Sequence, residues 1–330
     1  GVGNTRGNIS GNVNVQGITD LGWAGFANNE LLSTIHSHTL TYNKPISDDL
    51  AFDFVGGYEY QKFDFSGYAL AGRGFAVPDN DNTNAIQNSS NANKRFISYA
   101  DPISELQSYF GRANFGYKGK YNLTATLRAD GSSKFGENNQ YGIFPSIGAS
   151  WNIKSEDFLA DNDNISDMKL RLGWGKTGNQ EFPAGSAQER YALTENGGSI
   201  LENVANPDLK WESSTTLNFG LDFGIMNNRI TGSIDYYNRV TNDLLLDPSV
   251  SEPGPAVRAW KNIDGEVANT GVEIGLNAQI INKENLVWTL GGNISFLNNE
   301  FRNYTGPPIL TGDLFGQGSS GAYVQEMKNG

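Results

Sequence analysis

Apolar and polar residues alternate with a period of two along much of the chain. Within residues 120–130 every odd position is apolar and every even position is polar. An α-helix repeats its apolar positions every three to four residues, so strict alternation indicates β-strands with one apolar face. Clear alternation recurs at 146–153, 216–225 and 272–280, and weaker versions occur at 52–60, 109–117, 170–174, 230–236 and 286–296. The sequence therefore predicts an all-β fold with about ten strands.

The connections between these strands are alternately short and long. Short ones lie at 43–49, 118–120, 226–228 and 282–285, with a compact one at 154–167, whereas long ones lie at 61–104, 130–140, 176–210 and 241–271. An up-and-down barrel with this order has every short turn at one rim and every long loop at the other. Short periplasmic turns and long extracellular loops are typical of outer-membrane barrels. We therefore expect a transmembrane, antiparallel, up-and-down β-barrel rather than a soluble sandwich with connections of mixed length.

The two faces of the predicted strands differ in chemistry. Four aromatic residues, Tyr117, Tyr121, Trp151 and Trp288, lie near short turns on the apolar face. They fit an aromatic girdle at a membrane interface, and ordinary core packing is the alternative for each. Charges of both signs occupy the opposite face, which suits a watery lumen or the solvated face of a soluble sheet. These charged residues are Lys120, Arg128, Lys169, Arg171, Asp222, Arg229, Asp235, Arg239 and Glu273.

Composition excludes several classes of protein. The longest apolar runs fall far short of the ~20 residues that a membrane-spanning helix needs. The absence of cysteine rules out disulfides and thiolate metal sites. A formal net charge of -12 argues against a nucleic-acid partner. The first 25 residues lack the charged start and apolar core of a signal peptide. We expect either processing or a missing N-terminal part, and favour the missing part.

No constellation of residues suggests catalysis, so we do not expect an enzyme. The hydrolase, zinc-protease and phosphate-loop motifs do not occur in the sequence. His36 and His38 are two residues apart and could share a metal, but a third ligand is not evident nearby. Residues 79–84 begin like a calcium loop, yet lack its glycine and closing glutamate. We therefore expect neither a metal nor a cofactor.

Five segments, in order, resemble signatures of one transporter family. They are RADGSSKFG from Arg128 with YGIFPS from Tyr141, LRLGWGKTGNQ from Leu170, NPDLKWE from Asn206, DYYNR from Asp235 with TNDLL from Thr241, and GEVANTGVE from Gly265. Together they resemble the SusC/RagA-type TonB-dependent transporters of Bacteroidetes, from about Ser37 onward. The resemblance implies an outer-membrane location and a large barrel with a plugged lumen. It also implies that residues 1–330 are a portion of one barrel domain, with the plug and the closing strands absent.

The resemblance further implies TonB-dependent import of a nutrient, either an oligosaccharide or a peptide, together with a SusD-like surface lipoprotein. Aromatic and polar loop residues would then contact the substrate by stacking and hydrogen bonding. The alternative function is a soluble or surface carbohydrate-binding or adhesin module without transport, and a passive porin is a third hypothesis. The partners expected are the lipoprotein, the TonB complex, membrane lipid and the substrate. The loop candidates for substrate contact are Tyr68, Arg73, Phe75, Tyr191, Arg258 and Trp260.

Overall fold

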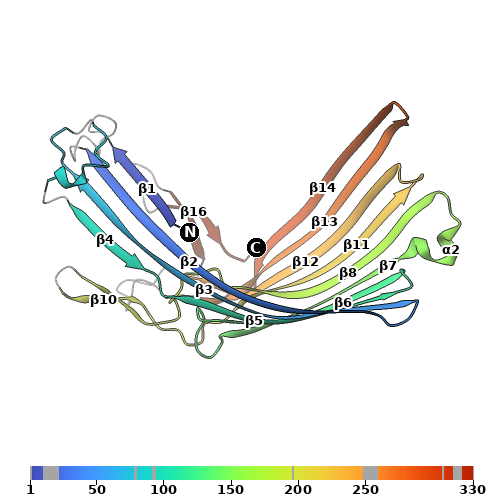
Figure 1. Ribbon diagram of the computed structural model, residues 1–330, viewed down its shortest axis with the longest axis horizontal. Helices are drawn as coiled ribbons and strands as arrows, with labels where there is room; N and C mark the ends of the chain where they lie inside the picture. The colour runs from blue at the N-terminus through green and yellow to red at the C-terminus, as the bar shows by residue number, and fades with distance from the viewer. Residues whose placement is uncertain are drawn as a thin grey trace. The chain divides into compact units, whose positions relative to one another are not determined.

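The computed structural model describes residues 2–9, 22–77, 80–90, 94–194, 197–247, 259–306, 308–314 and 322–329. Almost all regular structure within these ranges is β-strand (Figure 1). The helical segments of the described residues are the short turns η1 (Ile86–Asn88), η3 (Ile153–Ser155) and α2 (Asp157–Ala160). None of the helices in the described ranges is long and apolar enough to cross a membrane.

The described strands form one large antiparallel sheet and two small hairpins. The hairpins are β9 (Arg190–Leu193) with β10 (Ser199–Asn203), and β15 (Ile309–Leu314) with β16 (Ala322–Met327). The sheet runs in the order β1-β2-β3-β5-β6-β7-β8-β11-β12-β13-β14, and β4 pairs with β3. Its strands are β1 (Val2–Ile9), β2 (Trp23–Pro45), β3 (Leu50–Arg73), β4 (Arg95–Ala100), β5 (Ser104–Tyr117), β6 (Tyr121–Ser132), β7 (Tyr141–Asn152), β8 (Ile165–Asn179), β11 (Glu212–Ile225), β12 (Ile230–Leu246), β13 (Lys261–Lys283) and β14 (Leu286–Arg302).

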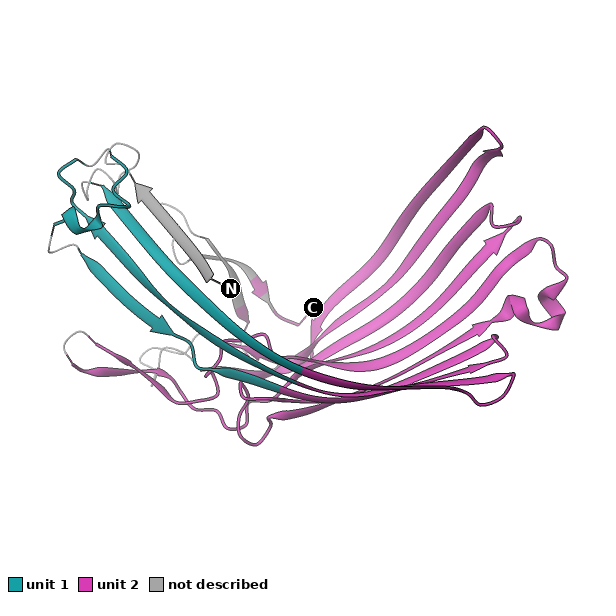
Figure 2. Ribbon diagram, in the orientation of Figure 1, with its two compact units in different colours: residues 1–36, 60–106 teal, residues 37–59, 107–330 magenta. Residues whose placement is uncertain are grey.

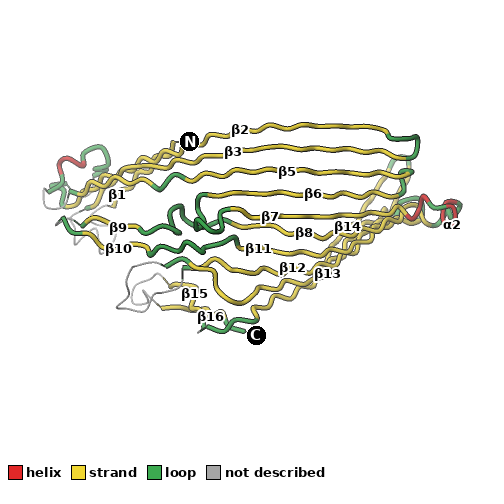
Figure 3. Tube along the Cα trace, turned by 90° about the horizontal axis from the view of Figure 1, so that it is seen from below, coloured by secondary structure: helices red, strands yellow, loops and turns green. Residues whose placement is uncertain are grey.

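The chain divides into two compact units (Figure 2). Unit 1 contains Gly1–His36 and Tyr60–Leu106, and unit 2 contains Ser37–Glu59 and Gln107–Gly330. In unit 2 the strands run side by side, and the connection that carries α2 projects beyond the ends of β7 and β8 (Figure 3). Most features described below belong to unit 2.

The alternation of short and long connections is confirmed. Antiparallel neighbours follow the order of the chain, so the short turns share one end of the sheet, here called the short-turn end. The two-residue turn at Lys118 and Gly119 has positive φ at both positions (53° and 63°), as in the hairpin turns that match strand twist. The β11–β12 turn has three consecutive positive φ values, at Met226, Asn227 and Asn228. The opposite end carries the long connections and is called the long-loop end.

The strands extend further into the long-loop end than the alternation predicts. The expected connection 61–104 was wrong in its first part, because β3 continues to Arg73 and has 24 residues. Likewise the expected connection 241–271 contains the end of β12 and nearly the first half of β13. A transmembrane strand needs only about 9–11 residues. Beyond that length both faces of a strand meet polar surroundings, so the alternation fades while backbone pairing continues.

The apolar face of the sheet is exposed. Leu127, Ile147 and Phe219 have exposed fractions of 56%, 49% and 45%. The strand register brings such residues into rows, as where Phe219 lies opposite Leu172 on one side and Tyr236 on the other. A soluble sandwich would bury this face, so the structure contradicts the soluble-module alternative. Outward residues are also exposed at 121, 123, 125 and 127 on β6 and at 288, 290, 294 and 296 on β14.

Opposite faces of one strand should respond differently to the same charged substitution. We expect Phe219→Arg to lower the free energy of unfolding in lipid by about 2–4 kcal/mol, the cost of arginine deep in the apolar band. Asn218→Arg, one residue away on the polar face, should change it by less than about 0.5 kcal/mol. Urea unfolding of the full-length protein in lipid vesicles measures both. Equal losses for the two variants would contradict this assignment of the faces.

Candidate functional site

The polar face carries a charged cluster at the centre of unit 2. The Arg171 guanidinium donates two hydrogen bonds to Asp222, at 2.8 and 2.7 Å, and a third to Asp235 at 2.8 Å. The three residues come from neighbouring strands β8, β11 and β12. Gly220 leaves the space for them, because a Cβ there would lie 2.5 Å from Asp235 Oδ1 and 2.7 Å from Arg171 Cζ. This cluster lines the side that faces the interior in a barrel.

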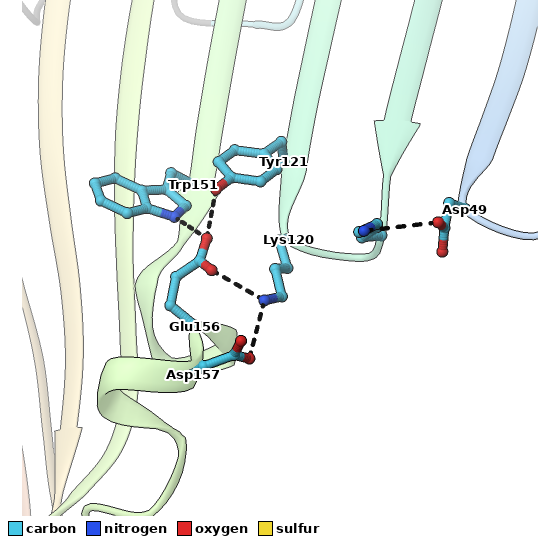
Figure 4. Close-up of polar contacts among 7 residues, drawn as sticks. Asp49, Lys120, Tyr121, Trp151, Glu156 and Asp157 are labelled. Atoms are coloured by element: carbon cyan, nitrogen blue, oxygen red, sulfur yellow. Dashed lines mark hydrogen bonds and ion pairs between the residues drawn. The ribbon is translucent and has the colours of Figure 1, made fainter.

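A second charged cluster lies at the short-turn end, on the connection between β7 and β8 (Figure 4). The Glu156 carboxylate accepts hydrogen bonds from the Tyr121 hydroxyl at 2.5 Å, the Lys120 ammonium at 2.9 Å and the Trp151 indole at 3.0 Å. Asp157 lies 3.7 Å from the same ammonium. The bonds from Tyr121, Lys120 and Trp151 hold the pKa of Glu156 at about 2. The carboxylate is therefore charged at every physiological pH.

This cluster holds two of the four aromatic residues that the sequence assigned to a girdle, Tyr121 and Trp151. Tyr121 stacks on Tyr117 and on Trp151, with ring centroids 6.3 Å apart in both pairs. Tyr117, Tyr121 and Trp288 are exposed on the apolar face, next to short turns. The Lys154 ammonium donates to the carbonyl oxygens of Leu159, Ala160 and Asn162 at about 3 Å, which closes the same connection.

The buried hydrophobic clusters lie at the long-loop end rather than within the membrane wall. The first contains Phe135, Phe182, Ala187, Leu209 and Leu245, with Trp211 and Trp260 packed against it. Its aromatic rings are in contact, with centroids 4.5 Å apart for Phe135 and Trp211 and 5.1 Å apart for Phe135 and Phe182. A second cluster contains Leu244, Ile263 and Phe301. We call the first cluster and its connections the loop layer.

Two of the signature segments meet in the loop layer. The amide of Gly136 donates to the Leu209 carbonyl at 3.0 Å, and the Trp211 indole donates to the Gln140 carbonyl at 3.0 Å. Gly136 is required because a Cβ would lie 2.0 Å from the Pro207 carbonyl oxygen. The NPDLKWE and RADGSSKFG segments therefore pack against each other. This agrees with the structural role that turn chemistry predicted for them.

Hydrogen bonds tie two further segments to this layer. Glu212 accepts from the Asn179 side chain and from the Leu245 amide, each at 3.0 Å. The Lys134 ammonium donates to the carbonyls of Phe182 at 3.0 Å and Gln180 at 3.4 Å. Burial lowers the pKa of Lys134, and the nearby Glu181 opposes the shift. The loop layer is thus a folded element in its own right.

The predicted substrate-contact residues that the structure describes belong to both units. Tyr191 lies on hairpin β9–β10 and is 57% exposed, whereas Trp260 packs against Phe182 with ring centroids 5.6 Å apart. In unit 1, Tyr68 and Arg73 are exposed and Phe75 is buried at 3%. Arg258 lies outside the described residues. Of the described candidates, Tyr68, Arg73 and Tyr191 offer exposed side chains to a ligand, while Phe75 and Trp260 contribute mainly to packing.

The two weak metal hypotheses gain no support from the described residues. His36 stacks on Tyr60 with ring centroids 6.3 Å apart. In the loop near residue 80, Asp81 accepts two bonds from Thr83, and the Asn82 amide donates to the carbonyls of Val77 and Asn80. These side chains therefore form hydrogen bonds within their own loop. Asp79 lies outside the described residues. No group of three metal-ligating side chains was found within the described ranges.

Sequence reasoning missed the Glu156 cluster and the loop layer. The connection 154–167 appeared only as a compact segment, because a single glutamate has no pattern that reveals three distant donors. The loop layer had one usable signal, namely the aromatic and leucine residues within the polar signature segments. Their placement in one cluster depends on how strands far apart in sequence are ordered in the sheet.

The apolar outward band, the charged opposite face and the one-sided long loops define this protein as part of an outer-membrane β-barrel. The family model "TonB dependent receptor-like, beta-barrel" matches residues 3–319. The chain belongs to this family, whose members are outer-membrane receptors and not enzymes.

Relatives and solved structures agree with this assignment. The chain is 36% identical over 328 residues to the TonB-dependent receptor SusC of Bacteroides thetaiotaomicron, covering 94% of the chain and 31% of that protein. It is 33% identical to the TonB-dependent receptor P3 of Formosa agariphila, covering 83% of the chain and 28% of the relative. The structure of the RagAB peptide importer in its closed-closed state matches with a TM-score of 0.79 at 25% identity, covering 93% of this chain and 34% of that one. The chain spans about a third of the length of these proteins.

The Glu156 cluster should give the short-turn end a characteristic pH dependence. The folded-state pKa of about 2 lies below the value expected in the unfolded chain, so the contribution of Glu156 is complete above about pH 4.5 and is lost as pH falls towards 2. We expect Glu156→Gln to lower the thermal midpoint at pH 7, and the difference from wild type to shrink between about pH 4 and pH 2. Glu284→Gln, on another short turn, is the control and should leave the midpoint unchanged. A difference that is constant with pH would contradict the assignment.

The loop layer should depend on Leu209, which is fully buried. We expect Leu209→Ala to lower the local free energy of unfolding by about 2–5 kcal/mol, the usual cost of replacing a buried leucine with alanine. Protease treatment of intact cells, followed by mapping of the cleaved loops, should show faster cleavage near residues 133–140 and 180–211. The Leu193→Ala variant, which changes a side chain that is 86% exposed, should be cleaved at the same rate as wild type. Unchanged cleavage of the Leu209 variant would show that the loop layer does not form a packed unit.

Proposed function

We propose that this chain is a portion of the barrel of a TonB-dependent importer that takes up an oligosaccharide or a peptide across the outer membrane. In this proposal a SusD-like surface lipoprotein captures the substrate, and the TonB complex supplies the energy. The chain contributes membrane wall, part of the polar inner surface and a folded layer of external loops.

The observation that carries the proposal is the match to the RagAB peptide importer, over 93% of this chain with a TM-score of 0.79. The 36% identity to SusC of B. thetaiotaomicron supports the same family of transport systems. The fold of the copper transporter OprC is less similar, with a TM-score of 0.52 at 16% identity. The similarity therefore favours a large organic substrate over a metal ion.

The remaining parts of the importer are proposed to lie elsewhere in a longer protein. The chain covers 31% of SusC, and β14 stands at one end of the strand order. Unpaired strand edges are not tolerated in lipid, so further strands must complete the barrel. A plug within the completed barrel would meet the face that carries Arg171, Asp222 and Asp235.

Among the substrate-contact candidates of unit 2, Tyr191 has the most suitable placement. It lies on an external hairpin in the connection between β8 and β11, with its ring more than half exposed. An aromatic ring in this setting can stack on a sugar ring or on a peptide side chain. The Arg190–Glu202 ion pair, at 3.3 Å, supports the hairpin beside it.

Uptake measurements on the full-length protein test the proposal. Cells lacking the gene should fail to take up the labelled substrate class, and a surface lipoprotein should co-purify with the detergent-extracted protein. We expect Tyr191→Ala to weaken substrate affinity roughly 2- to 10-fold, the effect of losing one stacking contact of about 0.5–1.5 kcal/mol. Tyr141→Ala is the matched control, because Tyr141 is 58% exposed but lies on the apolar face. Uptake of both peptides and oligosaccharides without this gene would contradict the function.

A further inference from the structure

A shallow apolar groove lies on the outward face of unit 2, beside the short-turn end. It has a volume of about 290 Å³, and its lining is almost entirely apolar. Strands β5, β6, β7 and β8 form its walls. Its principal lining residues are Phe115, Tyr117, Leu123, Ala149, Trp151 and Leu172.

The groove is formed by side chains that the Glu156 cluster holds in place. Tyr121 and Trp151 both line the groove, and both give their polar hydrogens to Glu156. The Tyr121 hydroxyl and the Trp151 indole N–H thus point to a protein carboxylate (Figure 4). The ring faces of both residues can therefore contact an apolar ligand. Ala149 keeps the groove open, since it lies between larger neighbours in the row formed with Leu123 and Leu172.

A positive charge stands at the rim of the groove. The Lys118 ammonium lies 5.4 Å from the centre of the Tyr117 ring, and its side chain is 45% exposed. It forms an exposed ion pair with the Asp49 carboxylate at 3.7 Å, a distance that is too long for a hydrogen bond. The ammonium therefore retains donor capacity for an anion at the membrane surface, and phosphate is the anion of lipid headgroups.

We propose that this groove binds one phospholipid of the periplasmic leaflet, with an acyl chain against the apolar walls and the phosphate at Lys118. Short turns of outer-membrane barrels face the periplasm, so the groove lies in the leaflet on that side. The groove begins at the Tyr117–Tyr121–Trp151 stack and extends towards Leu123 and Leu172, which is the direction from headgroup to chain. The apolar walls and the ammonium thus follow the order of groups in a phospholipid.

Lipid retention by the full-length protein tests this site. The protein is extracted in detergent, washed, and titrated with dioleoylphosphatidylglycerol or with dioleoylglycerol, and bound lipids are counted by native mass spectrometry. We expect Ala149→Trp to reduce retention of both lipids about tenfold, because the indole excludes two or more methylene groups from the walls. We expect Lys118→Gln to reduce retention of the phospholipid about tenfold, the effect of losing a charge-assisted hydrogen bond, and to leave dioleoylglycerol unchanged.

Ala125→Trp is the matched control for bulk on the same face. Ala125 is exposed, lies two residues beyond Leu123 on β6, and is outside the groove lining. It should retain lipid like wild type. The inference is overturned if Ala125→Trp and Ala149→Trp lose lipid equally, or if Lys118→Gln retains both lipids normally. Lys118 is in an exposed turn, so its variant keeps the test decisive even if Ala149→Trp does not fold.

Discussion

The antiparallel ladder of backbone hydrogen bonds is the interaction on which the rest of this protein depends. A lipid environment offers no partner for an amide or a carbonyl, so each strand within the membrane must be satisfied by its neighbours. The order of the strands follows the order of the chain, and this allows two- to four-residue turns at one end, except for the longer connection between β7 and β8. With the backbone satisfied in this way, the outward side chains need only be apolar, and they are exposed where a soluble protein would bury them.

Hydrophobic burial is consequently displaced to the long-loop end. Leu209, Phe135 and Phe182 pack in the loop layer, where water provides the driving force that lipid does not. Of the signature segments, NPDLKWE and the end of RADGSSKFG pack here, whereas LRLGWGKTGNQ and DYYNR lie largely within strands β8 and β12. Any outward apolar residue suits the membrane band, whereas the loop layer requires particular shapes, such as Gly136 against Pro207.

Charged groups have separate roles on the two sides of the wall. On the polar face, Arg171 forms ion pairs with both Asp222 and Asp235, which links three strands. Glu156 instead accepts hydrogen bonds from two aromatic residues of the apolar face, Tyr121 and Trp151, and from Lys120 of the opposite face. The Glu156 cluster thereby orders the side chains that line the apolar groove. The aromatic girdle therefore forms a groove in addition to contacting the membrane interface.

The sequence alone determined strands β5–β8 and β11–β14, the sides of the wall and the placement of the short and long connections, but not β1, β2 or the full lengths of β3, β12 and β13. It could do so because a strand with one apolar face repeats every two residues, as in residues 120–130, and that period depends only on local geometry. The family resemblance could be read for a related reason, since contiguous segments such as NPDLKWE carry it. The tertiary structure alone decided that Glu156 meets Tyr121 and Trp151, that Phe135 packs on Trp211, and that Trp260 contacts Phe182. These contacts join residues on different strands and connections, and strand register and loop packing set their distances, neither of which a local pattern records.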